Sequence, residues 1–221
     1  MKKRLLLGCG IIQQELEDAV QKYGIEDLDI RWMETGLHAE PKELNKALQK
    51  MIDETYDYDE IILGYGLCGN ALLGITATNC DILYPKTDDC ISSFMCELCN
   101  ANQLRRDSYF LSRGWLTMRS QDSLDDVRKK MFEKYDEETA EEILEMMYGN
   151  YKRIVYLQIE DEIAPEDLKK AKERAARMNF EFEIHPGSLR LYTNLILGDE
   201  SDPGVKRLKK GEFLTVRDFM D

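Results

Sequence analysis

The chain has 221 residues, of which 43% are hydrophobic, and its 43 acidic and 30 basic residues give a formal net charge of -13. A chain of this length can bury one substantial core, and its negative charge repels a phosphate backbone, so we expect no nucleic-acid partner. No apolar run approaches the roughly 20 residues that cross a bilayer, and no cleavage-site pattern is present, so we expect a cytoplasmic protein without membrane contact.

Strand-like and helix-like segments alternate through the first half of the chain. Apolar runs typical of strands lie at Arg4–Leu7, Asp29–Met33, Glu60–Gly64, Asp81–Tyr84 and Ser108–Leu111, and helical patterns lie at about Gln13–Tyr23 and Pro41–Thr55. This alternation predicts an α/β fold with Rossmann-like layers, in which a mainly parallel sheet has helices on both faces.

The second half begins with a charged segment that predicts an extra helical pair at about 120–150. It continues with a strand pattern at Ile154–Ile159, a helix at Pro165–Met178, a strand at Phe180–Ile184, a loop at Asp199–Gly204 and a last strand-like stretch at Phe213–Val216. We expect a single α/β domain over 1–221, in which residues 151–221 either complete the same sheet or form a second lobe.

Three of the six cysteines each follow an apolar strand pattern: Cys9, Cys68 and Cys90. The carboxyl ends of parallel strands meet at one edge of a sheet, where open α/β sheets bind their ligands. In a reducing compartment, cysteines at such an edge indicate metal binding or thiol chemistry rather than disulfides. We therefore expect Cys9, Cys68 and Cys90 to hold a metal centre.

Glycines flank Cys9 and cluster around Cys68 in the segment Gly64-Tyr65-Gly66-Leu67-Cys68-Gly69. Glycine lets the backbone approach a ligand closely, and a nearby lysine can neutralise the charge of thiolates. The predicted cofactor-binding residues are Gly8, Gly10, Gly64, Gly66, Gly69 and Lys86.

The candidate catalytic residues are His38, Tyr65 and Asp89. His38 follows the second strand pattern and could donate a proton, Tyr65 could offer its hydroxyl, and Asp89 could act as a base beside Cys90. Each has a structural alternative, which is a helix cap or an exposed position for His38, a core edge for Tyr65 and a helix cap for Asp89.

The remaining cysteines have weaker patterns. Cys96 and Cys99 have the C-x-x-C spacing, which places two thiols on one face of a helix, so they are either additional ligands or buried core thiols. Cys80 precedes a strand pattern at the opposite edge of the predicted sheet, and we expect a structural role for it.

The motifs Leu37-His38, Gly64-Tyr65-Gly66-Leu67-Cys68-Gly69 and Asp89-Cys90-Ile91 resemble those of the family catalogued as domain of unknown function 1638. This family is found chiefly in anaerobic bacteria and methanogenic archaea, and the resemblance runs over nearly the whole chain. It implies that Cys9, Cys68 and Cys90 are the recurring cysteines of the family. It also implies a supporting role in anaerobic one-carbon metabolism, beside corrinoid-dependent methyl transfer.

Three functions fit these residues. The first is a metal-centre protein with an iron–sulfur cluster, or zinc, on the three loop cysteines and one open coordination position. The second is a non-enzymatic accessory module that binds a corrinoid, a methyl carrier or a protein partner. The third is a thiol enzyme with Cys68 as nucleophile. The expected partners are a small-molecule ligand or a redox or methyl-transfer protein.

Overall fold

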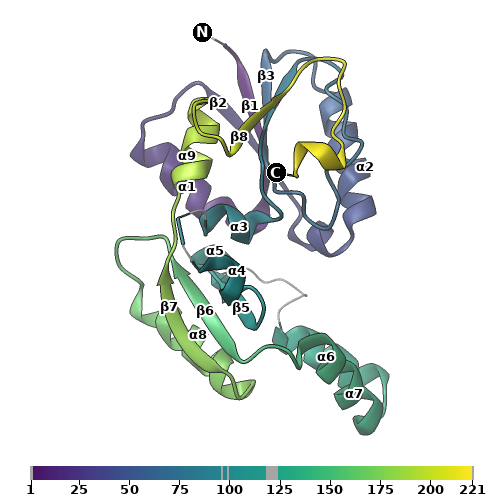
Figure 1. Ribbon diagram of the computed structural model, residues 1–221, viewed down its shortest axis with the longest axis vertical. Coiled ribbons are helices and arrows are strands. Elements are labelled where there is room, and N and C mark those ends of the chain that lie inside the picture. Colours follow the sequence, from purple (N-terminus) through teal and green to yellow (C-terminus); the bar gives the residue numbers. More distant parts are fainter. Residues whose placement is uncertain (1, 96, 99, 118–123, 221) are drawn as a thin grey trace. The chain divides into compact units, whose positions relative to one another are not determined.

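The computed structural model describes residues 2–95, 97–98, 100–117 and 124–220, and the chain forms two compact units (Figure 1). The first unit contains Met1–Glu97 and Ser188–Asp221, and the second contains Leu98–Gly187. The fold is mixed α/β, as expected. The boundary near residue 151 that the sequence suggested lies inside the second unit, because the strands on both sides of that residue belong to one small sheet.

The first unit is built on a five-stranded sheet with the order β2-β1-β3-β4-β8. Its strands are β1 (Arg4–Cys9), β2 (Leu28–Met33), β3 (Glu60–Gly64), β4 (Asp81–Pro85) and β8 (Val205–Leu208). The first four are parallel, and β8 pairs antiparallel with β4. Consecutive residues of β1 and β3 are fully buried, which is typical of a parallel strand covered on both faces.

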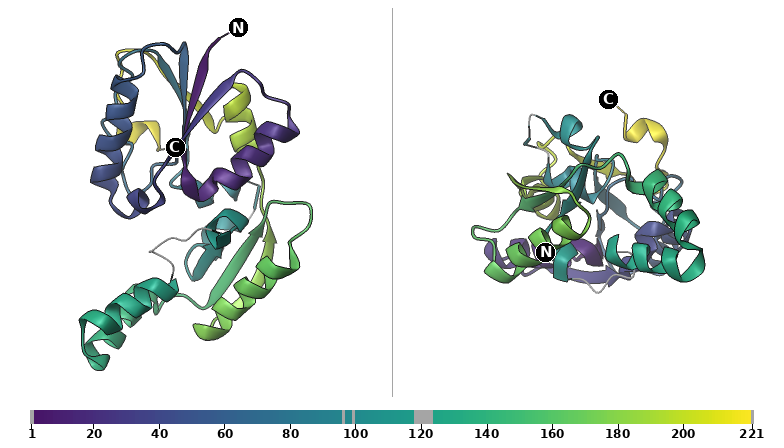
Figure 2. Two further views of the ribbon diagram at one scale, coloured as in Figure 1. Left: turned by 180° about the vertical axis from the view of Figure 1, so that it is seen from behind. Right: turned by 90° about the horizontal axis from the view of Figure 1, so that it is seen from below.

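Helices cover both faces of this sheet, which confirms the prediction. Helices α1 (Gln13–Lys22) and α9 (Arg190–Leu197) lie on one side and α2 (Pro41–Asp53) lies on the other, as Figure 2 shows from behind. The stripe Leu44, Leu48 and Ile52 is buried along α2, and Pro41 opens the helix in its first turn. Short helices follow three strands: η1 (Gly10–Ile12), η2 (Thr35–Ala39) and α3 (Cys90–Phe94).

The second unit has a three-stranded parallel sheet with the order β5-β6-β7. Its elements are α4 (Ala101–Leu104), β5 (Ser108–Leu111), α5 (Arg113–Thr117), α6 (Leu124–Lys134), α7 (Glu137–Tyr148), β6 (Arg153–Gln158), α8 (Pro165–Arg177) and β7 (Glu181–Pro186). Leu111, Ile154 and Tyr156 of the strands pack with Ala171 and Ala175 of α8 in its core. The pair α6 and α7 confirms the predicted helical pair. No helix in the described ranges is long and apolar enough to span a membrane.

Two elements near the carboxyl end were missed. Helix α9 is short, ends at Gly198 in the left-handed conformation (φ 74°), and buries five of its eight residues: Leu191, Tyr192, Thr193, Leu195 and Ile196. Strand β8 is an edge strand of four residues with a charged centre. The predicted strand at Phe213–Val216 is wrong, since only Phe213 bridges Thr76 and the helix η3 (Val216–Asp218) begins at Val216.

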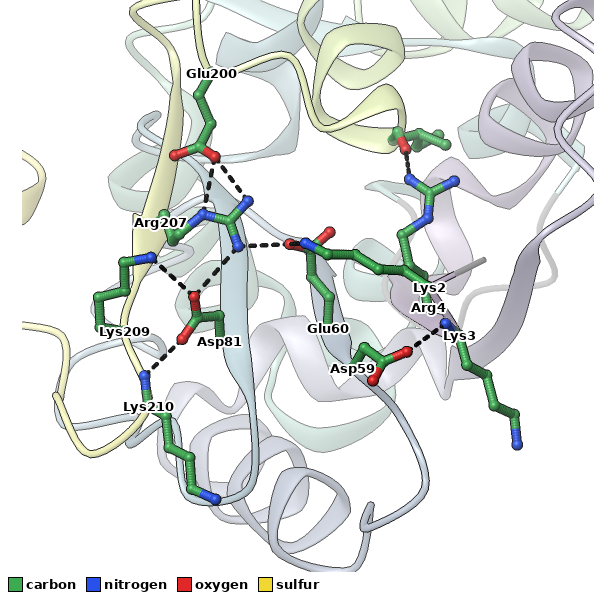
Figure 3. A network of polar contacts seen from close by, with 11 residues as sticks. Lys2, Lys3, Arg4, Asp59, Glu60, Asp81, Glu200, Arg207, Lys209 and Lys210 are labelled. Carbon is green, nitrogen blue, oxygen red and sulfur yellow. Dashed lines mark hydrogen bonds and ion pairs between the residues drawn. The ribbon is translucent and has the colours of Figure 1, made fainter.

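A charge network holds β8 to the amino-terminal edge of the sheet (Figure 3). The carboxylate of Glu60 is only 3% exposed and accepts a hydrogen bond from Arg207 Nη1 at 2.5 Å. The same guanidinium contacts Glu200 at 2.7 Å and Asp81 at 3.5 Å. The hydrogen bond to Glu200, followed by the one to Glu60, raises the pKa of Arg207. This edge is therefore structural.

Candidate functional site

Three neighbouring parallel strands end at one edge of the first sheet, as predicted. Strands β1, β3 and β4 are adjacent, and Gly8 lies opposite Gly64 in the register of β1 and β3. Cys9 is the last residue of β1, Cys68 lies in the loop after β3, and Cys90 is the first residue of α3 after β4. The three thiols therefore belong to this edge.

The loops after β3 and β4 run against each other. The backbone N–H of Leu67 donates to the carbonyl of Thr87, and that of Cys68 donates to the carbonyl of Asp88, both at 2.8 Å. A side chain at Gly66 would place its Cβ 2.7 Å from the backbone of Asp89, so glycine is required by this contact. Cys68 itself has a φ of 46°, a left-handed conformation that residues other than glycine rarely adopt. The contact between the two loops thus holds Cys68 in a strained conformation.

Nearby donor groups lower the pKa of two of the thiols. The backbone N–H groups of Cys90 and Gly66 act in this way on Cys68, and the N–H of Ile11 and the Tyr65 hydroxyl act in this way on Cys9. Burial nevertheless raises the pKa of Cys9 to about 11 and that of Cys68 to about 12. Burial, followed by the charge of Cys68, raises the pKa of Cys90 well above its usual range. All three groups are neutral thiols near neutral pH.

The prediction of a metal centre on Cys9, Cys68 and Cys90 is wrong. Among the described residues, no three His, Cys, Asp or Glu side chains are grouped so that they could hold one metal ion. Ligand sulfurs must all lie about 2.3 Å from one zinc ion as deprotonated thiolates. The described side chains of Cys9, Cys68 and Cys90 are not grouped in this way.

Two tyrosines and a carboxyl group adjoin the thiols. Tyr65 is 2% exposed, and its hydroxyl donates to the carbonyl of Gly8 at 3.2 Å. Tyr192 of α9 is buried against Phe94, with ring centroids 5.3 Å apart, and burial followed by the charge of Cys90 raises its pKa. Glu15 is 3% exposed, and its charge contributes to the raised pKa of Cys90. Burial likewise raises the pKa of Tyr65, so both phenols are neutral donors.

Sequence reasoning missed Tyr192 and Glu15. Tyr192 lies in α9, a helix that was not predicted, and it is far from the cysteines along the chain. Glu15 lies in the predicted helix Gln13–Tyr23, directly before the buried Leu16. The apolar Leu16 beside it is the signal in the sequence that could have placed Glu15 toward the core.

Asp89 is the N-terminal cap of α3. Its Oδ1 accepts hydrogen bonds from the backbone N–H of Ser92 at 2.8 Å and from its hydroxyl at 2.9 Å. This is the capping alternative that the sequence offered, and a role as a base stays a prediction. Lys86 is half-buried, and its N–H donates to the carbonyl of Gly204 at 2.7 Å.

The other predicted residues divide into two groups. Among the glycines, Gly8 packs against the ring of Trp32, which an added Cβ would overlap at 2.2 Å, so packing already requires this glycine. The cofactor-binding role of the glycines stays a prediction.

The side chain of His38, and all of Cys96 and Cys99, lie outside the described part of the chain. Cys80 is buried just before β4, at the opposite edge, as expected.

The raised pKa of Cys68 predicts an unusual pH dependence of its alkylation. Below its pKa the thiolate fraction rises tenfold per pH unit, so the rate with iodoacetamide should climb without levelling off from about pH 8 to pH 10.5. In urea the alkylation rate of the same cysteine should level off near its ordinary pKa of 9.0. Fragmentation mass spectrometry, which separates Cys68 from Cys80 on their shared tryptic peptide, measures both rates. A plateau near pH 9 in the native protein would contradict the raised pKa.

Fold and site together define a Rossmann-like α/β protein whose neutral thiols adjoin the ligand-binding edge of its parallel sheet. A family model described as "Protein of unknown function (DUF1638)" matches residues 32–196, and the chain therefore belongs to this family. This confirms the resemblance seen in the sequence. The chain has no match among curated proteins and none among solved structures.

Proposed function

We propose that the protein is a cytoplasmic dithiol–disulfide oxidoreductase in which Cys68 and Cys90 form the redox pair. The close approach of their two chain segments carries the proposal, since the backbone N–H of Cys68 donates to the carbonyl of Asp88 at 2.8 Å and Gly66 packs directly against the backbone of Asp89, the residue before Cys90. Both are free thiols that keep part of their surface exposed, whereas Cys9 is only 5% exposed. Reversible disulfide formation requires two thiols whose chain segments lie close together and that a substrate can reach.

The substrate is a small-molecule disulfide, which acts as the oxidant. The thiolate of Cys68 attacks one substrate sulfur, the substrate S–S bond breaks, and the first substrate thiolate leaves and takes up a proton. The thiolate of Cys90 then attacks the sulfur of Cys68 and releases the second substrate thiol. Two protein S–H groups and one substrate disulfide thus become one protein disulfide and two substrate thiols, with two electrons transferred.

The surroundings of Cys68 set the rate of the first step. Burial disfavours the thiolate, while the N–H groups of Gly66 and Cys90 lower the pKa and oppose that effect. A thiolate of higher pKa is also a stronger nucleophile, which offsets part of the lost thiolate fraction. We therefore expect slow exchange at neutral pH that accelerates as the pH rises.

The release of glutathione from oxidised glutathione tests this function. Reduced protein carrying Cys96→Ser and Cys99→Ser is mixed with oxidised glutathione without oxygen, and the reduced glutathione formed is counted. The expected release is two equivalents per chain, falling to one or fewer when Cys68→Ser is added.

Cys80→Ser is the matched control, because Cys80 is a free, buried cysteine at the opposite edge of the sheet. It should leave the release of both equivalents unchanged. An equal loss in the Cys80→Ser and Cys68→Ser variants, or full release without Cys68, would refute the proposed redox pair.

A further inference from the structure

The hydroxyl of Tyr192 is a buried polar group without a hydrogen bond in the described part of the first unit. Tyr192 lies in α9, and its side chain is fully buried. Among the described residues, no donor or acceptor is placed to bond its hydroxyl oxygen. Ser93 of α3 lies near it, but the Ser93 hydroxyl pairs with that of Thr87 at 2.9 Å. A buried hydroxyl without a partner destabilises the folded state, so it calls for an explanation, of which a catalytic role is one.

The face of α3 that carries Cys90 packs against Tyr192. Residues three and four positions apart share one face of a helix, so Ser93 and Phe94 lie on the same side of α3 as Cys90. The ring of Phe94 contacts that of Tyr192, with centroids 5.3 Å apart, and both side chains are buried. This contact within the first unit brings Tyr192 and Cys90 together. Burial raises the pKa of Tyr192, and the charge of Cys90 raises it further, as expected of close neighbours.

Several influences disfavour the thiolate of Cys90. Burial raises its pKa, and so do the charges of four neighbours: Cys68, Cys9, Asp89 and Glu15. A neutral thiol is a weak hydrogen-bond partner, whereas a thiolate is a charged acceptor that forms stronger hydrogen bonds. Rotation about the Cα–Cβ bond of a cysteine moves its sulfur between staggered positions. A neutral phenol beside Cys90 thus gains a strong acceptor once the thiol loses its proton.

We infer that the Tyr192 hydroxyl donates a hydrogen bond to the thiolate of Cys90, and this role in catalysis rests on the proposed exchange, in which Cys90 performs the second step. Cys90 releases its proton to water, and its thiolate attacks the sulfur of Cys68. The bond between Cys68 and the substrate breaks, and the substrate sulfur leaves with the electron pair and takes up a proton. The phenol keeps its own proton throughout. Its hydrogen bond raises the thiolate fraction more than it lowers the nucleophilicity, so the second step is faster.

Tyr192→Phe tests this role, because it keeps the ring and removes only the hydroxyl. The full chain also carries Cys96→Ser and Cys99→Ser, which leaves Cys90 as the one cysteine of its tryptic peptide. Iodoacetamide should label Cys90 about three- to tenfold more slowly than in the chain with Tyr192, with the same slope from about pH 8 to pH 10. At an oxidised glutathione concentration that makes the second, intramolecular step limiting, the second equivalent should be released more slowly by a similar factor and the first at an unchanged rate.

Tyr156→Phe is the matched control. Tyr156 is also a fully buried tyrosine, but its hydroxyl donates to Glu160 Oε1 at 2.5 Å. Its loss should lower the melting temperature of the reduced protein and leave the labelling of Cys90 unchanged. Tyr192→Phe should do the reverse, since the hydroxyl that it removes bonds no described residue. The labelling of Cys80, at the opposite edge of the sheet, reports any general opening of the first unit and should stay constant.

Two results would overturn the inference. One is labelling of Cys90 at the wild-type rate in Tyr192→Phe, even where the release of glutathione supports the proposed exchange. The other is a loss of melting temperature as large as that of Tyr156→Phe together with faster labelling of Cys80, which would make Tyr192 a structural residue. If the protein releases no glutathione while Tyr192→Phe still slows the labelling of Cys90, the hydrogen bond is supported and the proposed exchange fails.

Discussion

Replacing Arg207 by methionine is expected to lower the free energy of unfolding by about 3–5 kcal/mol, the usual cost of leaving one member of a buried ion pair without its partner. Glu60 is 3% exposed, and its remaining cation is Lys2, 3.6 Å away with a side chain 63% exposed. Methionine also breaks the contact of Arg207 with Asp81, which joins β8 to β4, and its contact with Glu200 in the loop before β8.

Urea denaturation of the single and double variants separates the cost of an unpaired Glu60 from the loss of the other contacts of Arg207. Lys209→Met is the matched control, because Lys209 is 64% exposed and pairs with Asp81, so its loss should cost less than about 1 kcal/mol. Adding Glu60→Leu to Arg207→Met removes the unpaired carboxylate and should recover a large part of the stability. Equal effects of Arg207→Met and Lys209→Met would show that the burial of Glu60 carries no cost.

Gly66→Ala is expected to damage both the fold and the thiol pair. The added Cβ would lie 2.7 Å from the backbone N and Cα of Asp89, and backbone atoms cannot turn aside as a flexible side chain can. The loops after β3 and β4 must separate, at a cost of about 1–3 kcal/mol for overpacking. Because Cys68 and Cys90 lie on these two loops, their disulfide should also form more slowly.

Gly24→Ala distinguishes this clash from a general effect of losing a glycine. Gly24 has a φ of 61° and open space around its Cα, so alanine there carries only the conformational cost of about 1 kcal/mol. It should leave the reaction of Cys68 with oxidised glutathione unchanged. If Gly66→Ala is as stable and as reactive as the wild type, the close contact of the two loops does not exist in solution.

The sheet edge could be predicted because β1, β3 and β4 are short apolar runs, of which β1 and β3 pass at once into glycine or cysteine and β4 ends at Pro85. Such runs fix where a parallel strand ends, and alternation with helices fixes that the ends share an edge. The direction of a side chain in the following loop is not encoded in this way. Cys68 has a positive φ, and its backbone N–H donates to the carbonyl of Asp88 in the neighbouring loop, which no spacing of cysteines indicates.

Helix α9 and strand β8 were missed for a different reason. Helix α9 and strand β8 return to the first sheet after the chain has passed through the second unit, so their burial depends on contacts that are distant in sequence. Tyr192 reaches the thiols only through this return. Local propensity and periodicity carry little information about such long-range packing.

The most direct measurement is the mass-spectrometric mapping of the disulfide formed when the reduced protein reacts with oxidised glutathione, with Cys96→Ser and Cys99→Ser present throughout. The redox pair predicts one linkage, between the peptides of Cys68 and Cys90, assigned by fragmentation because Cys80 shares a tryptic peptide with Cys68. A product in which Cys68 and Cys90 both remain thiols, or each carries glutathione without a bond between them, would contradict it.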